Sequence, residues 1–84
     1  MRIDKFLKVS RLIKRRETAK NLCDDGDILI NGKIAKAMSE VKDGDTLTLA
    51  LGKKRVEVIV KEVRPFANKE QASLMFEVIN DETL

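Results

Sequence analysis

The spacing of apolar residues changes near residue 26, and that change limits the folds that the chain can adopt. Between residues 3 and 24, apolar side chains recur three and four positions apart, which is the period of an amphipathic helix. From residue 27 to residue 63, they alternate with polar residues or form short runs between turn signals, which is typical of strands. A chain of 84 residues has room for one domain. We therefore expect an α+β domain in which the helices come first and cover a sheet.

Two helices are predicted before the sheet. One is expected over residues 3–13 and the other from about residue 16 to residue 24, with Gly26 as the left-handed residue that ends it. Asp4 suits the first helical turn, where its carboxylate meets the positive end of the helix dipole, and it can also pair with Lys8 one turn on. The apolar faces hold Ile3, Phe6, Ser10 and Ile13 in the first helix, and Ala19, Leu22 and Cys23 in the second.

Four strands are predicted to follow. Asn31-Gly32 is a strong signal for a two-residue hairpin, and Lys42-Asp43-Gly44-Asp45 predicts a second turn. The strands are expected over residues 27–30, 33–35, 46–51 and 55–63.

Beyond Pro65 the pattern fits two structures. Residues 68–71 resemble a capping box, and apolar residues follow at helical spacing as far as Ile79, although residues 73–79 also fit a strand. We predict a short helix here, in an acidic tail that faces away from any bound phosphate and acts as a lid or brace. The predicted fold is two N-terminal helices packed on a small, mostly antiparallel sheet of about four strands, with a short C-terminal helix. Residues 1–64 form the domain, and residues 65–84 form a short C-terminal extension of it.

The residue inventory excludes several kinds of chemistry. The chain has no histidine and one cysteine, so it lacks an imidazole base, a zinc site built from Cys and His, and an internal disulfide. We expect no enzymatic activity, no metal and no cofactor. Cys23 lies on an apolar helix face and is predicted to be packed core. No segment resembles a signal peptide or a membrane span, so we expect a cytoplasmic protein with no membrane partner.

Positive charge is concentrated at the start of the chain. The first 20 residues carry eight basic residues against two acidic ones, a net charge of +6, while the remaining 64 carry nine against twelve, a net charge of −3. A basic stripe of this kind attracts a polyanion. Nucleic acid is therefore the leading partner, although a basic helix face is also often a solvated surface. The candidate RNA-binding residues are Arg2, Lys5, Lys8, Arg11, Lys14, Arg15, Arg16 and Lys20.

Weaker candidates lie elsewhere in the chain. Lys53, Lys54 and Arg55 form a second cationic spot at the tip of a predicted hairpin, where they would contact RNA backbone. Phe66, beside Pro65, is a weak candidate for stacking on a base, because the other two phenylalanines fall on apolar stripes. The glycines of the two turns set chain geometry, since no phosphate-binding loop spacing accompanies them.

More than half of the chain resembles a known RNA-binding module. The residues that carry the resemblance are Arg2-Ile3-Asp4-Lys5-Phe6-Leu7, Arg11-Leu12, Arg16, Ala19, Gly26, Ile28, Ile30-Asn31-Gly32 and Val41-Lys42-Asp43-Gly44-Asp45. In this order and spacing they are similar to the S-four RNA-binding domain, named after the fourth protein of the small ribosomal subunit. The resemblance implies an S-four-like αL fold, whose basic helical face docks on structured RNA. It also assigns Asp4 to support of that face. Arg15 departs from the pattern, because many S-four domains have a small hydroxyl residue there that can cap the second helix.

As a free-standing S-four domain, the chain resembles the RqcP family of bacterial ribosome-quality-control factors, and also the related heat-shock ribosome-binding proteins, which carry a longer tail. The first resemblance implies a monomer that binds the obstructed large (50S) subunit through rRNA and peptidyl-tRNA. It implies a tailing factor of the RqcH type on the same particle, and support of C-terminal alanine tailing of the stalled chain for degradation. The alternatives are a general structured-RNA module in ribosome assembly or translation, and an accessory domain of an RNA-modifying enzyme.

Overall fold

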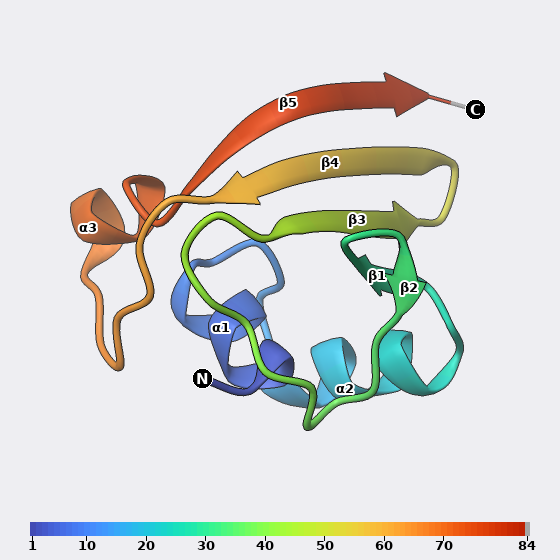
Figure 1. Ribbon diagram of the computed structural model, residues 1–84, viewed down its shortest axis with the longest axis horizontal. Helices are drawn as coiled ribbons and strands as arrows, with labels where there is room; N and C mark the ends of the chain where they lie inside the picture. Colours follow the sequence, from blue (N-terminus) through green and yellow to red (C-terminus); the bar gives the residue numbers. More distant parts are fainter. Residues whose placement is uncertain (84) are drawn as a thin grey trace.

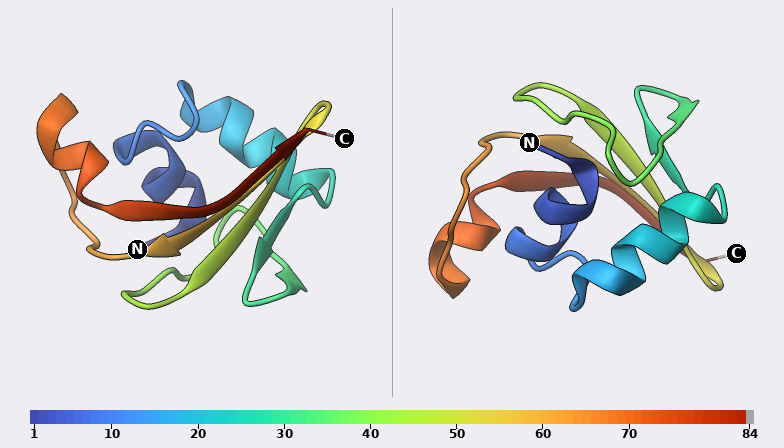
Figure 2. Two further views of the ribbon diagram at one scale, coloured as in Figure 1. Left: turned by 90° about the horizontal axis from the view of Figure 1, so that it is seen from above. Right: turned by 90° about the horizontal axis from the view of Figure 1, so that it is seen from below.

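In the computed structural model, which describes residues 1–83, two helices pack against one antiparallel sheet (Figure 1). Figure 2 shows α1 and α2 on the same side of the sheet, with α3 beyond one end of it. The helix-first, strand-second order predicted from apolar spacing is therefore confirmed. The elements are α1 (Ile3–Val9), α2 (Arg16–Asp24), β1 (Ile28–Ile30), β2 (Lys33–Ile34), β3 (Thr46–Leu51), β4 (Lys54–Val60), α3 (Lys69–Ser73) and β5 (Phe76–Thr83).

The sheet has the strand order β2-β1-β3-β4-β5, and every neighbouring pair is antiparallel. The predicted hairpin between β1 and β2 is present. Asn31 and Gly32 both have positive φ, at 51° and 83°, which is what a type I′ turn requires. The Asn31 side chain also accepts a hydrogen bond from the Thr46 backbone N–H at 2.9 Å, which ties this turn to the start of β3.

The core lies between the two helices and the sheet. Ile3, Phe6 and Leu7 of α1 are fully buried, and α2 adds Ala19 and Cys23. Burying a side chain of the size of leucine or phenylalanine stabilises a fold by about 1.5–3 kcal/mol. The basic residues of both helices are thereby held on the side away from the sheet. The sheet contributes the fully buried side chains of Ile28, Leu47, Leu49 and Val58, with Val60 at 1% exposure.

The first helix is shorter than predicted. It ends at Val9 instead of continuing to Ile13, because Ser10 competes for the helix backbone and Arg11 leaves the helical region. The buried Ser10 hydroxyl donates to the Leu7 carbonyl at 3.3 Å, and Arg11 has a φ of 64°. Ile13 still reaches the core, since its N–H donates to the Leu7 carbonyl at 3.0 Å.

The C-terminal segment combines a helix with a fifth strand. The capping box is confirmed, because the Asn68 side chain accepts from the Gln71 N–H and the Gln71 side chain accepts from the Asn68 N–H. The strand that residues 73–79 also fitted is confirmed from Phe76 onward, and it follows the predicted short helix. The helix ends at Ser73, and β5 pairs with β4 from Val60↔Phe76 onward. Pairing along the free edge of β4 outweighs the local helical spacing, so the sheet has five strands where about four were expected.

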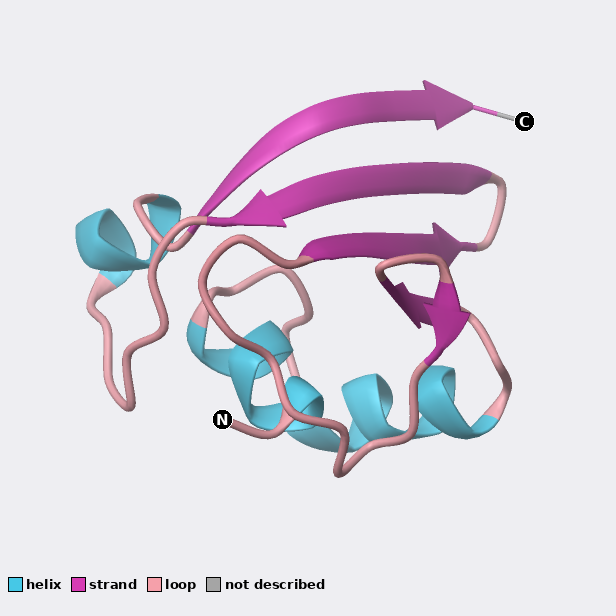
Figure 3. Cartoon of the chain, in the orientation of Figure 1, coloured by secondary structure: helices cyan, strands magenta, loops and turns pink. Residues whose placement is uncertain are grey.

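Figure 3 shows the loops that connect these helices and strands. One loop joins α1 to α2, and a longer one, residues 61–68, runs from β4 to α3. Among residues 1–83, every helix is too short and too polar to cross a bilayer.

Candidate nucleic-acid interface

The eight N-terminal cations occupy one continuous stretch of structure. Arg2 precedes α1, Lys5 and Lys8 lie on it, Arg16 and Lys20 lie on α2, and the other three lie in the connecting loop. Seven of the eight are exposed and Lys5 is partly buried. Within the described part of the chain, six of them form no ion pair, and Arg2 and Arg16 share one acidic partner. The N-terminal charge is therefore largely free to meet an external anion. The six are Lys5, Lys8, Arg11, Lys14, Arg15 and Lys20.

The acidic partner is Asp4, whose side chain is only 4% exposed. Its Oδ2 accepts a hydrogen bond from Arg2 Nη2 at 3.1 Å, and its Oδ1 accepts one from Arg16 Nη2 at 3.4 Å. Oδ1 also accepts from the Lys5 backbone N–H at 2.8 Å. The possible pair with Lys8 was wrong, because this carboxylate is buried next to α2 and not on the exposed side of α1. Asp4 thus holds two guanidinium groups from different parts of the chain in fixed positions.

These guanidinium groups border a hollow of about 430 Å³. It lies between the start of α1 and the first half of α2. Its lining combines three cations with Asp4 and one exposed acid, Glu17. Arginines held in this way present their remaining donors to a phosphate without first losing conformational freedom. The lining residues are Arg2, Asp4, Arg16, Glu17, Lys20 and Asn21.

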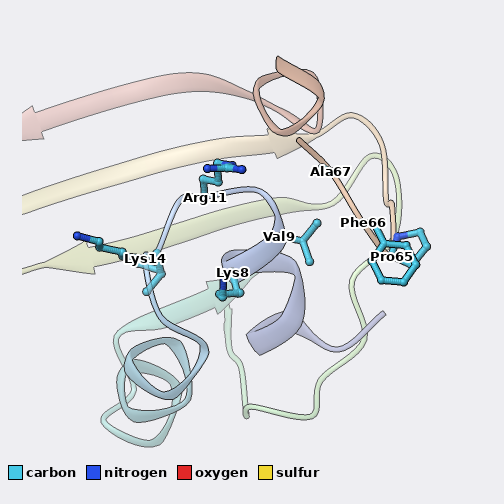
Figure 4. A pocket seen from close by; sticks show the side chains of 8 residues that line it. Lys8, Val9, Arg11, Lys14, Pro65, Phe66 and Ala67 are labelled. Carbon is cyan, nitrogen blue, oxygen red and sulfur yellow. The ribbon is translucent and has the colours of Figure 1, made fainter. Parts of the chain in front are cut away.

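A second hollow, of about 550 Å³, lies between the end of α1, the connecting loop and the 61–68 loop (Figure 4). Figure 4 shows Val9 directed toward Pro65 and Phe66, which come from the far loop. The cations that border it are Lys8, Arg11 and Lys14. The full lining is Lys8, Val9, Arg11, Ile13, Lys14, Pro65, Phe66 and Ala67.

Arg11 has an unusual backbone for a residue with a large side chain. A positive φ in a residue other than glycine costs about 1–2 kcal/mol and often marks a functional position. Here it ends α1 and turns the chain toward α2, so that Arg11 and Lys14 border the hollow while Ile13 returns to the core. The positive φ of Arg11 therefore ends the helix and also places two cations beside the hollow.

The comparisons with known proteins agree with this geometry. The S4 domain family matches residues 1–47. The chain is 54% identical to the "RQC P-site tRNA stabilizing factor" of Bacillus subtilis, over all of this chain and 98% of that protein. It is 50% identical to the protein of the same name from Halalkalibacterium halodurans, over all of this chain and 96% of the relative. The chain belongs to the RQC P-site tRNA stabilizing factor family.

Solved structures similar to this family member share the fold. Heat Shock Protein 15 of Vibrio cholerae, described as trimeric, has a TM-score of 0.86 and 26% identity, covering 93% of this chain and 80% of that one. The solution structure of a protein designated HP1423 has a TM-score of 0.81 and 36% identity, covering 98% and 100%. The S-four-like fold predicted from the motifs is confirmed.

The weaker cationic candidates are partly neutralised in this family member. Lys54 Nζ lies 3.4 Å from an Asp81 carboxylate oxygen, and Arg55 Nη2 lies 3.6 Å from a Glu57 carboxylate oxygen. Lys53, between β3 and β4, has no acidic partner among residues 1–83. Strand β5 supplies Asp81, whose carboxylate offsets part of the positive charge at this hairpin.

Cys23 is buried against the core, as predicted. Burial, with lesser contributions from the nearby acidic groups of Asp4 and Asp24, raises the pKa of its thiol from 9.0 to about 11. A neutral thiol is a poor nucleophile. We expect Cys23 to resist iodoacetamide at pH 8 in the native protein and to react readily in urea, as measured by mass spectrometry.

The sign of the pH dependence at Cys23 follows from the raised pKa. The folded state keeps its proton to higher pH, so this group's contribution to stability is present below pH 9 and is lost as the pH rises toward 11. Rapid native alkylation at pH 8 would contradict the buried position.

The sequence did not predict which distant parts of the chain meet at the site. The link from Asp4 to Arg16 joins residues twelve positions apart, and the approach of the 61–68 loop to α1 depends on the whole sheet. The only local signal for the second feature was the apolar pair Pro65-Phe66 within a polar segment.

Proposed function

We propose that this chain is an RNA-binding ribosome-quality-control factor that binds the obstructed large ribosomal subunit and stabilises the tRNA in its P site. The proposal rests on six cations that form no ion pair within residues 1–83 and that lie along α1, the connecting loop and α2, where two hollows are found. It also rests on sequence identity with relatives named for that role. The eight N-terminal cations are the proposed RNA-binding residues. Asp4 is proposed as their support, with Lys53, Lys54 and Arg55 in a lesser role.

The proposed mechanism is electrostatic docking. The deep groove of A-form RNA excludes side chains, so a protein recognises its shape, its phosphates and its 2′-hydroxyl groups. Arginine grips a phosphate with two parallel donors, while lysine supplies a mobile point charge. Arg2 and Arg16 would therefore set the position of the RNA, and the lysines would add attraction. Such binding requires no bond chemistry, and we propose that the chain is not an enzyme.

Several finer features belong to the same proposal. The factor would contact both large-subunit rRNA and peptidyl-tRNA, and would act beside a tailing factor of the RqcH type during alanine tailing. It would do so as a cytoplasmic monomer. Residues 65–84 would extend the domain of residues 1–64, and the pairing of β5 with β4 supports their assignment to a single unit.

Sedimentation of tagged protein from a cell lysate tests this proposal. We expect enrichment on free large subunits that carry peptidyl-tRNA, because these particles present both proposed RNA partners without a small subunit. Puromycin treatment, which releases the nascent chain from accessible peptidyl-tRNA, should reduce that enrichment, with untreated particles as the control. An equal distribution over all ribosomal particles and free RNA would overturn the proposal and favour a general structured-RNA module.

A further inference from the structure

Phe66 is the most exposed large apolar side chain in the described structure, with 82% of its surface accessible. A single exposed apolar residue is ordinary on a protein surface. The surroundings of Phe66 are unusual, however, because it borders the hollow of about 550 Å³ together with Pro65 and three cations. That volume is in the range of about 300–1,000 Å³ found for small-molecule sites.

The two faces of the Phe66 ring have different environments. Lys5 Nζ lies 5.8 Å from the ring centroid, within the range of a cation–π contact, and Lys5 does not line the hollow. The ammonium group of Lys5 therefore lies over one face of the ring. Because Phe66 is 82% exposed and also borders the hollow, most of the ring surface remains accessible to a ligand there.

The charge of the hollow indicates what it can bind. Lys8, Arg11 and Lys14 border it, none of them has an acidic partner within residues 1–83, and its lining includes no acidic residue. An aromatic surface surrounded by cations suits a ligand with a flat ring and negative charge. A nucleotide in an RNA strand has both.

We propose that this hollow binds one unpaired nucleotide of an RNA, with the base stacked on Phe66 and the adjacent phosphates held by Lys8, Arg11 and Lys14. This inference rests on the proposed RNA-binding function and specifies one contact within it. A base inside a duplex is stacked on its neighbours, whereas a bulged or looped base can be splayed out and stacked on an aromatic side chain. The hollow therefore selects RNA with an extruded base near its docking face.

A fluorescent variant tests this stacking directly. The chain contains no tryptophan, so Phe66→Trp introduces a single indole whose emission reports contact with a base. Two RNA hairpins serve as probes, identical except for one bulged nucleotide. We expect strong quenching on titration with the bulged hairpin and little with the fully paired one. Equal emission changes with both hairpins would overturn the proposal.

Binding measurements on variants without tryptophan separate the contribution of base stacking from that of apolar side-chain volume at position 66. Phe66→Ala should weaken binding of the bulged hairpin by roughly 5- to 100-fold, the range expected for one lost base–aromatic stack. Its effect on the paired hairpin should be small. Phe66→Leu, which keeps apolar bulk without a flat ring, should behave like the alanine variant. Leu74→Ala is the matched control, since Leu74 is 61% exposed and lies outside the hollow.

The outcomes distinguish this inference from the function on which it rests. If wild type binds both hairpins in a strongly salt-dependent way and Phe66→Ala changes neither affinity, the stacking site is wrong and the RNA-binding function stands. If wild type binds neither hairpin above the level of a neutral protein of the same size, both proposals fail. Since Phe66 is largely exposed, circular dichroism should show all variants folded.

Discussion

A double variant, Arg11→Ala with Arg16→Ala, is expected to weaken binding to large ribosomal subunits by about 100-fold or more while the protein remains folded. Arg11 borders one hollow and Arg16 the other, so the variant removes one cation from each. A hydrogen bond to a charged group contributes about 1.5–3 kcal/mol, and two such losses account for the expected effect. Sedimentation of purified protein with large subunits at fixed salt measures it.

The matched control removes the same charge from another place. Lys33 and Lys36 are exposed and lie outside both hollows, so Lys33→Ala with Lys36→Ala gives an equal net charge. We expect this control to retain most of its affinity. Equal losses in the two double variants would mean that total charge, and not the surface of α1 and α2, determines binding. Unchanged binding by the arginine variant would show that the interface is wrongly assigned.

Replacement of Asp4 by alanine is expected to lower both stability and RNA affinity, even though it raises the net charge by one. The buried carboxylate holds Arg2, Arg16 and the Lys5 backbone N–H. The two arginine side chains are 47% exposed, so water replaces part of what they lose. We expect a loss of about 1–3 kcal/mol in unfolding free energy, or roughly 5–20 °C in Tm, measured by thermal denaturation.

The affinity of the Asp4→Ala variant is the more informative measurement. Freed arginines must be ordered when they bind, at about 0.5–1.5 kcal/mol for each side chain. At a temperature where the variant is folded, we expect binding to weaken by roughly 5- to 100-fold, with a similar salt dependence. Tighter binding would show that removing a negative charge outweighs the loss of positioning. Asp4→Asn, which retains an oxygen acceptor for the Lys5 N–H, should recover part of the stability.

Local sequence patterns predicted the elements whose ends are set by local chemistry. Helix α2 and strand β3 have the predicted boundaries, and the Asn31-Gly32 turn has the predicted backbone. The apolar spacing continued to Ile13 and therefore predicted a longer helix α1. The helix ends earlier, because the buried Ser10 hydroxyl bonds to its backbone and Arg11 adopts a left-handed conformation. Strand β5 was left as one of two alternatives, because its apolar residues also fit a helix and its pairing with β4 joins segments that are distant in sequence.

The candidate site was predictable in composition but not in arrangement. A count of charges located all eight cations in one segment, and the structure places them along α1, the connecting loop and α2. Their division between two hollows depends on folding, because the bond from Arg16 to Asp4 and the approach of Phe66 to α1 are both long-range. The partial pairing of Lys54 and Arg55 likewise required the position of strand β5 and the side-chain geometry of β4.

The salt dependence of binding tests the central claim most directly, because the account attributes docking to phosphates held by the cations of α1 and α2. Wild-type protein should be titrated with a structured rRNA or tRNA fragment over a series of salt concentrations. Neutralisation of about five phosphates predicts a slope near −4 for log affinity against log salt. A slope flatter than about −1 would contradict an electrostatic dock.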